Sequence, residues 1–393
     1  MSESAHSNNR NITLTLSQEE AVSCNDRYIA VIAGPGSGKT RVLTERVVRL
    51  IEEGHIPSES ILALSFSAKA ANEVRKRLKE RLGYNDRLPF RNLLIKLYNR
   101  IQLSIFHISS NEDVVIGEDG WLFYNGVYDG NPIGHYTGEI QFSEQELERI
   151  ADNLIATRDE LREQGTEFVV FIAPNKERIY AEYMPSYFGE PAEKYPVMQL
   201  IQYLKEHTDI RVVYPYEELM AYKQSNPQQL LYFKTDTHWN ELGGYIGTRA
   251  LLKELGTEIQ RPDEVTLVQY ERNGGDLAGM LNLQEAFASE KGYSISGYNG
   301  YQIAVEENAL PGEENYVAVG APEKKVFVIR DSFYGSMAAY LAPQFAYSRA
   351  SHVDLFSTDM IESWNPDIVV FEIVERYVKR LNIPIMDKGK KVE

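Results

Sequence analysis

The chain has 393 residues, of which 43% are hydrophobic and 25% charged, a composition typical of a globular protein with buried cores. No apolar run reaches the roughly 20 residues of a membrane-spanning helix. The polar N-terminus lacks the basic and apolar segments of a secretory signal, so the chain as written is expected in the cytoplasm. The single cysteine, Cys24, excludes an internal disulfide framework and a cysteine-based zinc site.

Charge is distributed unevenly along the chain. Residues 1–82 contain 12 Lys and Arg against 10 Asp and Glu, whereas residues 83–393 contain 29 against 47. The acidic second segment repels nucleic acid, and the first is not basic enough to bind it, so nucleic acid is not expected as a partner. The change near residue 82 predicts two domains, 1–82 and 83–393.

Residues 33–40, AGPGSGKT, carry a phosphate-binding loop motif between a predicted strand at 28–32 and a predicted helix. In this motif the glycines turn backbone N–H groups toward phosphate, Lys39 reaches the outer phosphates and Thr40 holds magnesium. ATP and magnesium are therefore the expected cofactors of this loop. Its predicted nucleotide-binding residues are Ala33, Gly34, Pro35, Gly36, Ser37, Gly38, Lys39 and Thr40.

The flanking segments LSQEEAV (16–22) and ILALSFSAKAANEVRKRL (61–78) extend this pattern. Together the motifs resemble the N-terminal ATP-binding region of UvrD/Rep-type superfamily 1 helicases over residues 14–82. The resemblance implies that Gln18 reads the adenine and that residues 65–71 contact single-stranded DNA. Hydrolysis also requires an acidic pair and an arginine, but no later motif of that family follows. We interpret the segment as a truncated strand–helix fragment that binds nucleotide without complete hydrolysis or unwinding machinery.

The second segment alternates strand and helix patterns. VVIGEDGWLFY (114–124) predicts a hairpin that turns at Asp119 and Gly120, and 143–165 predicts a helix with a capping box between Ser143 and Glu146. Strands are predicted at 167–174, 210–215, 325–331, 344–349 and 367–373, with helices at 197–206, 240–255 and 336–341. This alternation predicts an α/β fold with a mostly parallel sheet flanked by helices.

Asp236, His238 and Ser332 are the candidate catalytic residues. In an extended TDTHWN segment, Asp236 and His238 share a face, so the carboxylate can orient the imidazole. Ser332 follows a strong strand, at the sheet edge where α/β sites collect. Backbone N–H groups at Phe333 and Tyr334 could form part of an oxyanion hole. From the residues alone, the alternative stays open that Asp331 and Ser332 only cap the following helix.

Six further motifs occur in order over residues 84–378. They are YNDRLPFRNLLI, VIGEDGWLFY, FIAPNKERIYAEYMP, LYFKTDTHWNELGGYIGTRALL, GGDLAGML and VFVIRDSFYGSMAAYL. The series resembles the AlgX/AlgJ-like family of SGNH-hydrolase-like polysaccharide O-acetyltransferases and the related DHHW proteins. The resemblance implies an SGNH-like fold and cofactor-free acetyl transfer to a sugar hydroxyl through an acetylated Ser332. It also implies a polysaccharide acceptor, a membrane-bound acyltransferase that delivers acetyl, and an extracytoplasmic location.

Residues around the nucleophile depart from the family pattern. Residues 330–333 read Arg-Asp-Ser-Phe where alginate members carry a Gly-Thr-Ser-Tyr type motif, which leaves the sugar acceptor open. Asn175, Lys176 and Arg178 follow the first strong strand and either line the cleft or form a solvated loop. Tyr334 either orients the substrate or packs as a core aromatic. Three functions stay open: a serine-dependent acetyltransferase or esterase, a nucleotide-binding helicase fragment, and a non-catalytic fusion protein.

Overall fold

The structure is a computed structural model that describes residues 14–386 except 27–28, 33, 35–36, 57–60, 62, 64–67, 83–90 and 307–312. The chain divides into two compact units, Met1–Phe106 and His107–Glu393. The division falls after α4 (Arg91–Ile101) and η2 (Gln102–Phe106), which the charge-based boundary near residue 82 assigns to the second domain. The two boundaries differ because charge balance does not report where contacts within a unit end.

The first unit is helical in its described residues. It contains α1 (Leu16–Ser23), α2 (Lys39–Glu52), α3 (Ala68–Leu82), α4 and η2. Arg46 and Arg49 of α2 donate to the carbonyl oxygen of Val22 at the end of α1, which joins these two helices. The strand predicted at 28–32 is wrong for residues 29–32, which pair with no described strand. Val31 and Ile32 are 51% and 99% exposed there, and a strand forms only where a neighbour satisfies its backbone groups.

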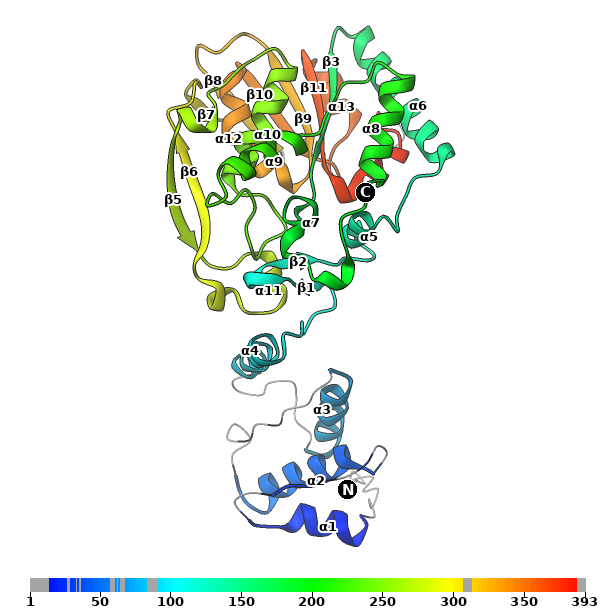
Figure 1. The fold of residues 1–393 in the computed structure, drawn as a ribbon, viewed down its shortest axis with the longest axis vertical. Helices are drawn as coiled ribbons and strands as arrows, with labels where there is room; N and C mark the ends of the chain where they lie inside the picture. Colours follow the sequence, from blue (N-terminus) through cyan, green and yellow to red (C-terminus); the bar gives the residue numbers. More distant parts are fainter. Residues whose placement is uncertain are drawn as a thin grey trace, which may run out of the picture. The chain divides into compact units, whose positions relative to one another are not determined.

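The second unit is built on a seven-stranded sheet with the order β4-β3-β11-β9-β10-β8-β7 (Figure 1). The five strands from β4 to β10 run parallel, and β8 and β7 add an antiparallel edge. In sheet order the strands are β4 (Val212–Val213), β3 (Glu167–Ala173), β11 (Ile368–Val374), β9 (Lys325–Arg330), β10 (Tyr347–His352), β8 (Glu313–Ala318) and β7 (Ile303–Val305). The predicted mostly parallel sheet is confirmed.

Helices cover both faces of this sheet because successive strand residues point to opposite sides. Phe168 and Val170 of β3 join a core with α6, α8 and α13, whereas Val169 and Phe171 join a core with α10 and α12. These helices are α6 (Glu144–Glu163), α8 (Pro196–His207), α13 (Thr358–Trp364), α10 (Glu241–Glu254) and α12 (Ala338–Leu341), and α9 (Tyr216–Ser225) packs against α10. The predicted capping box between Ser143 and Glu146 starts α6.

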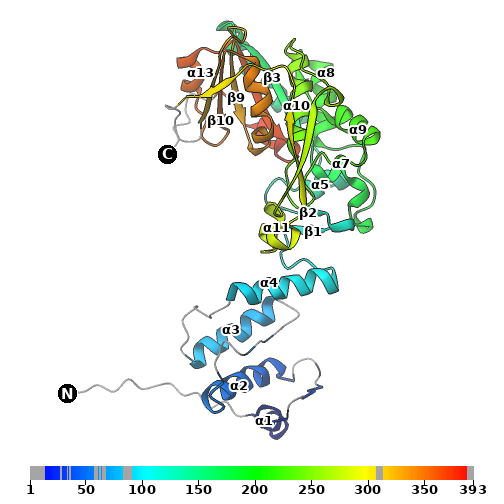
Figure 2. The ribbon, with the colours of Figure 1, turned by 90° about the vertical axis from the view of Figure 1, so that its left-hand side faces the viewer.

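Two antiparallel ribbons flank the sheet. β5 (Thr266–Arg272) and β6 (Glu290–Ser296) form a long ribbon beside α10 (Figure 2). β1 (Val114–Ile116) and β2 (Leu122–Tyr124) form the predicted hairpin, with Asp119 and Gly120 in left-handed backbone conformations that suit its tight turn. The strand predicted at 344–349 starts later, at Tyr347, because Ala342–Gln344 forms a 3₁₀ turn around Pro343.

Parallel strands bring their following segments to one edge of the sheet. β3 leads into α7 (Lys176–Ile179), β9 into η8 (Ser332–Ser336) and β11 into η10 (Glu375–Asn382). The hairpin β1–β2, α5 (Pro132–Thr137) and α11 (Asp276–Met280) lie at the same end of the unit (Figure 1). The remaining short 3₁₀ turns are Glu118–Gly120, Ala181–Tyr183, Ser186–Phe188, Pro262–Glu264 and Gln284–Phe287. Of the helices described, none has the length and hydropathy needed to traverse a bilayer.

Candidate active site

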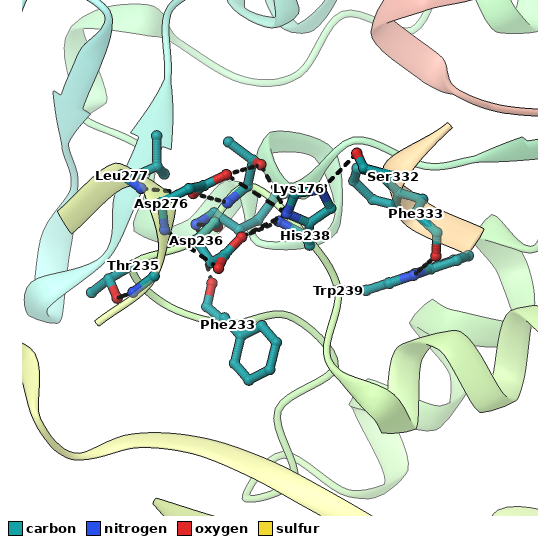
Figure 3. A network of polar contacts seen from close by, with 12 residues as sticks. Lys176, Phe233, Thr235, Asp236, His238, Trp239, Asp276, Leu277, Ser332 and Phe333 are labelled. Carbon is teal, nitrogen blue, oxygen red and sulfur yellow. Dashed lines mark hydrogen bonds and ion pairs between the residues drawn. The ribbon is translucent and has the colours of Figure 1, made fainter. Parts of the chain in front are cut away.

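The structure places Asp236, His238 and Ser332 in one hydrogen-bonded series at the carboxyl edge of the sheet (Figure 3). His238 Nε2 lies 2.7 Å from Ser332 Oγ, and His238 Nδ1 lies 2.7 Å from Asp236 Oδ1. Asp236 is buried, His238 is partly exposed and Ser332 is exposed. A base held between a hydroxyl and a carboxylate can take up the hydroxyl proton while the carboxylate stabilises the imidazolium.

Asp331 fixes the turn that presents Ser332. Its Oδ1 accepts the Phe333 N–H at 2.8 Å, which caps η8, and its Oδ2 accepts the Val374 N–H at 2.7 Å from β11. The Asp331 N–H donates to the buried Glu372 carboxyl group at 2.9 Å. Asp331 therefore has the capping role that the sequence offered as an alternative, and the adjacent Ser332 hydroxyl still faces His238.

Lys176 organises the loop that carries Asp236. Its Nζ donates to the carbonyl oxygens of Phe233, Lys234 and Asp236 at 3.1, 3.1 and 2.6 Å. The side chain is 2% exposed, and burial lowers the pKa of Lys176 to about 8 despite the neighbouring carboxylates. Lys176 therefore neither lines an open cleft nor belongs to a solvated loop, the two interpretations that the sequence left open. Its three donors instead match three loop carbonyl groups that have turned inward.

Asn175 and Arg178 are also enclosed, so the cleft-lining and solvated-loop interpretations are both wrong. Asn175 Oδ1 accepts the Arg376 N–H at 3.2 Å, and Arg178 donates to the carbonyl oxygen of His135 at 3.3 Å. The Arg178 guanidinium stacks 3.4 Å over the Tyr195 ring. The segments around α5 and η10 supply these partners and cover the loop, which the local sequence could not indicate.

Phe333 and Tyr334 pack beneath the site and do not face solvent. Each is 1% exposed, and the Phe333 ring centroid lies 4.9 Å from that of His238. The Phe333 N–H is taken by Asp331, which contradicts its predicted place in an oxyanion hole. Burial raises the pKa of Tyr334, whose hydroxyl has no hydrogen-bond partner among the described residues. For Tyr334 the core-aromatic interpretation therefore holds, since a fully enclosed ring cannot contact a substrate.

Sequence reasoning missed two charged residues beside the Asp–His pair. Asp276 Oδ2 lies 3.6 Å from His238 Nδ1, and Arg272 approaches Asp236 Oδ2 to 3.4 Å. Burial opposes ionisation of Asp236, but hydrogen bonds from His238 and its charge hold the pKa of Asp236 well below the usual range. The GGDLAGML motif contained the available signal, because an acid directly after two glycines opens a helix there.

The same acidic cluster contains the groups that could hold a cation. Asp236, His238 and Asp276 each offer one ligand atom, and these atoms lie within 4.8 Å of one another. In this structure the same oxygens accept hydrogen bonds from His238 and from Thr237, so the donor set is already engaged. We therefore assign no metal to these three residues.

The phosphate-binding loop opens α2 in the first unit. Gly38 has a φ of 86°, which favours glycine, and Lys39 Nζ donates to the Gly34 carbonyl oxygen at 2.7 Å. Gln18 Nε2 donates to the Ser37 carbonyl oxygen at 3.0 Å, so the predicted adenine contact lies beside the loop. A cavity of about 390 Å³ is lined by Gln18, Ser37, Gly38, Lys39, Thr40, Arg41 and Arg77. Ala33, Pro35 and Gly36 lie outside the described residues.

Two family models match the chain in tandem. The UvrD/REP helicase N-terminal domain matches residues 14–115, and the SGNH hydrolase-like domain, acetyltransferase AlgX, matches residues 114–315. The second match spans more than half of the chain. The chain belongs to this AlgX-type SGNH hydrolase-like family. Both predicted resemblances and the predicted SGNH-like α/β fold are confirmed.

Individual relatives follow the same division. For the AlgX-type unit, the probable alginate O-acetylase AlgJ of Pseudomonas syringae is 23% identical over 320 residues, which cover 76% of this chain and 77% of that protein. For the first unit, the DNA helicase PcrA of Bacillus subtilis is 47% identical over 66 residues, 17% of this chain and 9% of the helicase. The chain therefore spans under a tenth of the helicase.

A solved structure supports the fold of the AlgX-type unit. PatB1 of Bacillus cereus superposes with a TM-score of 0.51 and 17% sequence identity. The superposition covers 70% of this chain and 99% of PatB1. At this identity the likeness shows the shared fold and nothing about substrate.

Proposed function

We propose that the chain is a serine-dependent O-acetyltransferase, or acetyl esterase, that acts on a carbohydrate hydroxyl group. The observation that carries this proposal is the position of His238, within 2.7 Å of both Ser332 Oγ and Asp236 Oδ1. Membership of the AlgX-type family supports acetyl transfer as the reaction class. Similarity to a protein described as an alginate O-acetylase supports a polysaccharide as the acceptor.

The reaction proceeds in two half-reactions. Ser332 Oγ attacks the carbonyl carbon of an acetyl ester while His238 Nε2 takes the hydroxyl proton, and Asp236 stabilises the resulting imidazolium. The ester bond of the donor breaks, and His238 returns the proton to the departing alcohol. A sugar hydroxyl, or water in the esterase reaction, then attacks acetyl-Ser332 and gives its proton to His238. The acetylated sugar or acetate leaves, and Ser332 regains its hydrogen.

The acetyl donor is the second component of the proposal. No cofactor is needed for the transfer itself, because the ester bond of the donor already activates the acetyl group. We propose a membrane-bound acyltransferase as the partner that delivers acetyl, which requires the two proteins to share a compartment. The exposed position of Ser332 supports delivery by a large partner, since the nucleophile can be approached from solvent.

Hydrolysis of a chromogenic acetyl ester tests the catalytic proposal. Wild type is compared with Ser332→Ala and His238→Ala, and Ser336→Ala on the same turn serves as the matched control. We expect loss of hydrolysis and of acetyl-enzyme formation only in the first two variants. Equal rates for wild type and Ser332→Ala would refute the proposal. Acetyl transfer to a panel of oligosaccharides then distinguishes transferase from esterase.

We propose nucleotide binding as a second function, located in the first unit. The cavity lined by Gln18, Lys39 and Thr40 at the start of α2 supports it, because helix N-termini and lysine attract phosphate. ATP with magnesium is the expected ligand, with Thr40 as the magnesium contact, and turnover is not expected. Titration with a fluorescent ATP analogue should saturate for wild type and fail for Lys39→Ala. Identical titrations of the two proteins would contradict nucleotide binding at this loop.

A further inference from the structure

A second carboxylate approaches the candidate base on the side away from the nucleophile. Figure 3 shows His238 between Ser332 on one side and Asp236 and Asp276 on the other. Asp276 Oδ2 lies 3.6 Å from His238 Nδ1, the nitrogen that Asp236 Oδ1 contacts at 2.7 Å. Asp276 is the first residue of α11, which lies in the connection between β5 and β6, so tertiary folding brings it to His238.

Hydrogen bonds hold the Asp276 carboxylate in this position. Its Oδ1 accepts the backbone N–H groups of Thr237 and Leu277 at 2.8 and 2.6 Å. Its Oδ2 accepts the Thr237 hydroxyl at 2.6 Å. Thr237 immediately precedes His238, so Asp276 fixes the backbone that carries the base as well as facing its ring. Donors of this kind stabilise the charged form of a carboxylate.

The charges around His238 do not cancel within the contact distance of its ring. Asp236 and Asp276 both face Nδ1, whereas the cations lie further out: Arg272 contacts Asp236 Oδ2 at 3.4 Å, and Lys176 contacts the Asp236 carbonyl oxygen at 2.6 Å. Two uncharged groups also contact the ring: Thr237 Oγ1 lies 3.2 Å from Nδ1, and the Phe333 ring centroid lies 4.9 Å from that of His238. When the imidazole becomes a cation during attack, a second negative charge at 3.6 Å therefore stabilises it.

We propose that Asp276 is a positioning residue that orients His238 through Thr237 and supplies a second negative charge to the imidazolium formed during the reaction. This inference rests on the proposed function of Ser332 and His238. The two carboxylates then have different roles. Asp236 fixes the tautomer of His238 by direct contact, and Asp276 lowers the energy of the charged form of His238. Asp276→Asn keeps the size of the side chain and an oxygen acceptor for Thr237, and it removes the charge.

Reaction of Ser332 with a sulfonyl fluoride tests the proposal in the full-length chain, because it requires the activated serine but no acetyl donor or acceptor. The rate constant of inactivation is measured against pH for wild type, Asp276→Asn, Asp276→Glu and the exposed control Asp263→Asn. For Asp276→Asn we expect a rate about tenfold lower on the plateau, the effect of about 1.4 kcal/mol.

Each outcome separates this inference from the proposed function. Recovery of rate in Asp276→Glu, with wild-type behaviour of Asp263→Asn, supports a role for charge. A plateau rate in Asp276→Asn equal to that of wild type, with Ser332 still labelled, would overturn the inference and leave the proposed role of Ser332 and His238 intact. Labelling of wild type no faster than of His238→Ala would overturn both. Thermal unfolding of each variant identifies any that fails to fold, and Asp276→Glu then decides the outcome.

Discussion

Trp239 Nε1 donates a hydrogen bond to the carbonyl oxygen of Phe333 at 2.9 Å, with both residues fully buried. Each residue is the chain neighbour of a member of the triad, since Trp239 follows His238 and Phe333 follows Ser332. This bond therefore couples the segment of the base to the turn of the nucleophile, across 94 residues of sequence. It adds to the direct contact between His238 Nε2 and Ser332 Oγ a second hydrogen bond that holds the two segments together.

Trp239→Phe should lower the rate of ester hydrolysis more than it lowers substrate affinity. The change removes the indole donor to the buried Phe333 carbonyl oxygen, at a cost of about 1–3 kcal/mol in unfolding free energy. The rate falls because the serine turn is no longer held against the His238 segment. Steady-state kinetics and thermal unfolding measure both effects. The control is Trp364→Phe on α13, and equal rate constants for the two variants would contradict the coupling.

Lys176→Met should destabilise the second unit and reduce activity together. Three inward-facing carbonyl groups lose their common donor. The cost of leaving these buried acceptors without that donor exceeds the gain from no longer burying a cation. We expect a loss of about 2 kcal/mol, equivalent to a fall of about 5 °C in melting temperature. Differential scanning calorimetry measures it against Lys205→Met, an exposed control on α8. An unchanged melting temperature would mean that the Asp236 loop is held by other contacts.

Gly275→Ala should abolish activity by displacing Asp236. An added Cβ at Gly275 would lie 2.3 Å from both Asp236 Cβ and Asp236 Oδ2, too close for any rotamer of that buried side chain to avoid. Gly335→Ala is the matched control on the nucleophile turn, where an added Cβ meets no atom within 4 Å. Acetyl-ester hydrolysis by both variants tests the prediction. Comparable activity in the two would show that the Asp236 loop can move away without loss of function.

Glu372→Gln should change how stability depends on pH. Burial, followed by the negative charge of Asp331, raises the pKa of Glu372 well above its ordinary value of 4.5. Between that value and the raised pKa, the folded chain holds a proton that the unfolded chain has released. Stability therefore falls as pH rises through this window. Glutamine is neutral at every pH, so the stability of the variant does not fall in this window through titration at position 372.

We expect Glu372→Gln to match wild type near pH 4.5 and to exceed it by about 1 kcal/mol or more at pH 8. Urea unfolding of the second unit at both pH values gives the difference. The exposed Glu254→Gln serves as control. Parallel pH dependence in wild type and Glu372→Gln would mean that Glu372 is already ionised in the folded state.

Local sequence predicted several elements of the second unit and the three candidate catalytic residues. The capping box at Ser143, the turn at Asp119 and Gly120, and the apolar runs of β3, β9 and β11 depend on neighbouring residues only, and the structure has them where the pattern predicts. The Asp-x-His spacing and a serine at the end of a strand are likewise local. Resemblance to known motifs then selected this serine and this histidine from many.

Tertiary structure decided which residues next to the strand ends are buried and which face the candidate active site. Lys176, Arg178 and Phe333 stand next to strand ends, where a local pattern predicts a cleft, but each is buried by segments distant in sequence. Asp276 shows the reverse: its local sequence marks the start of a helix, but only the tertiary structure brings this carboxylate to within 3.6 Å of His238 Nδ1. The reason is physical: hydrogen-bond capping and strand periodicity act over a few residues. Burial and ionisation, in contrast, depend on every segment that packs against a group.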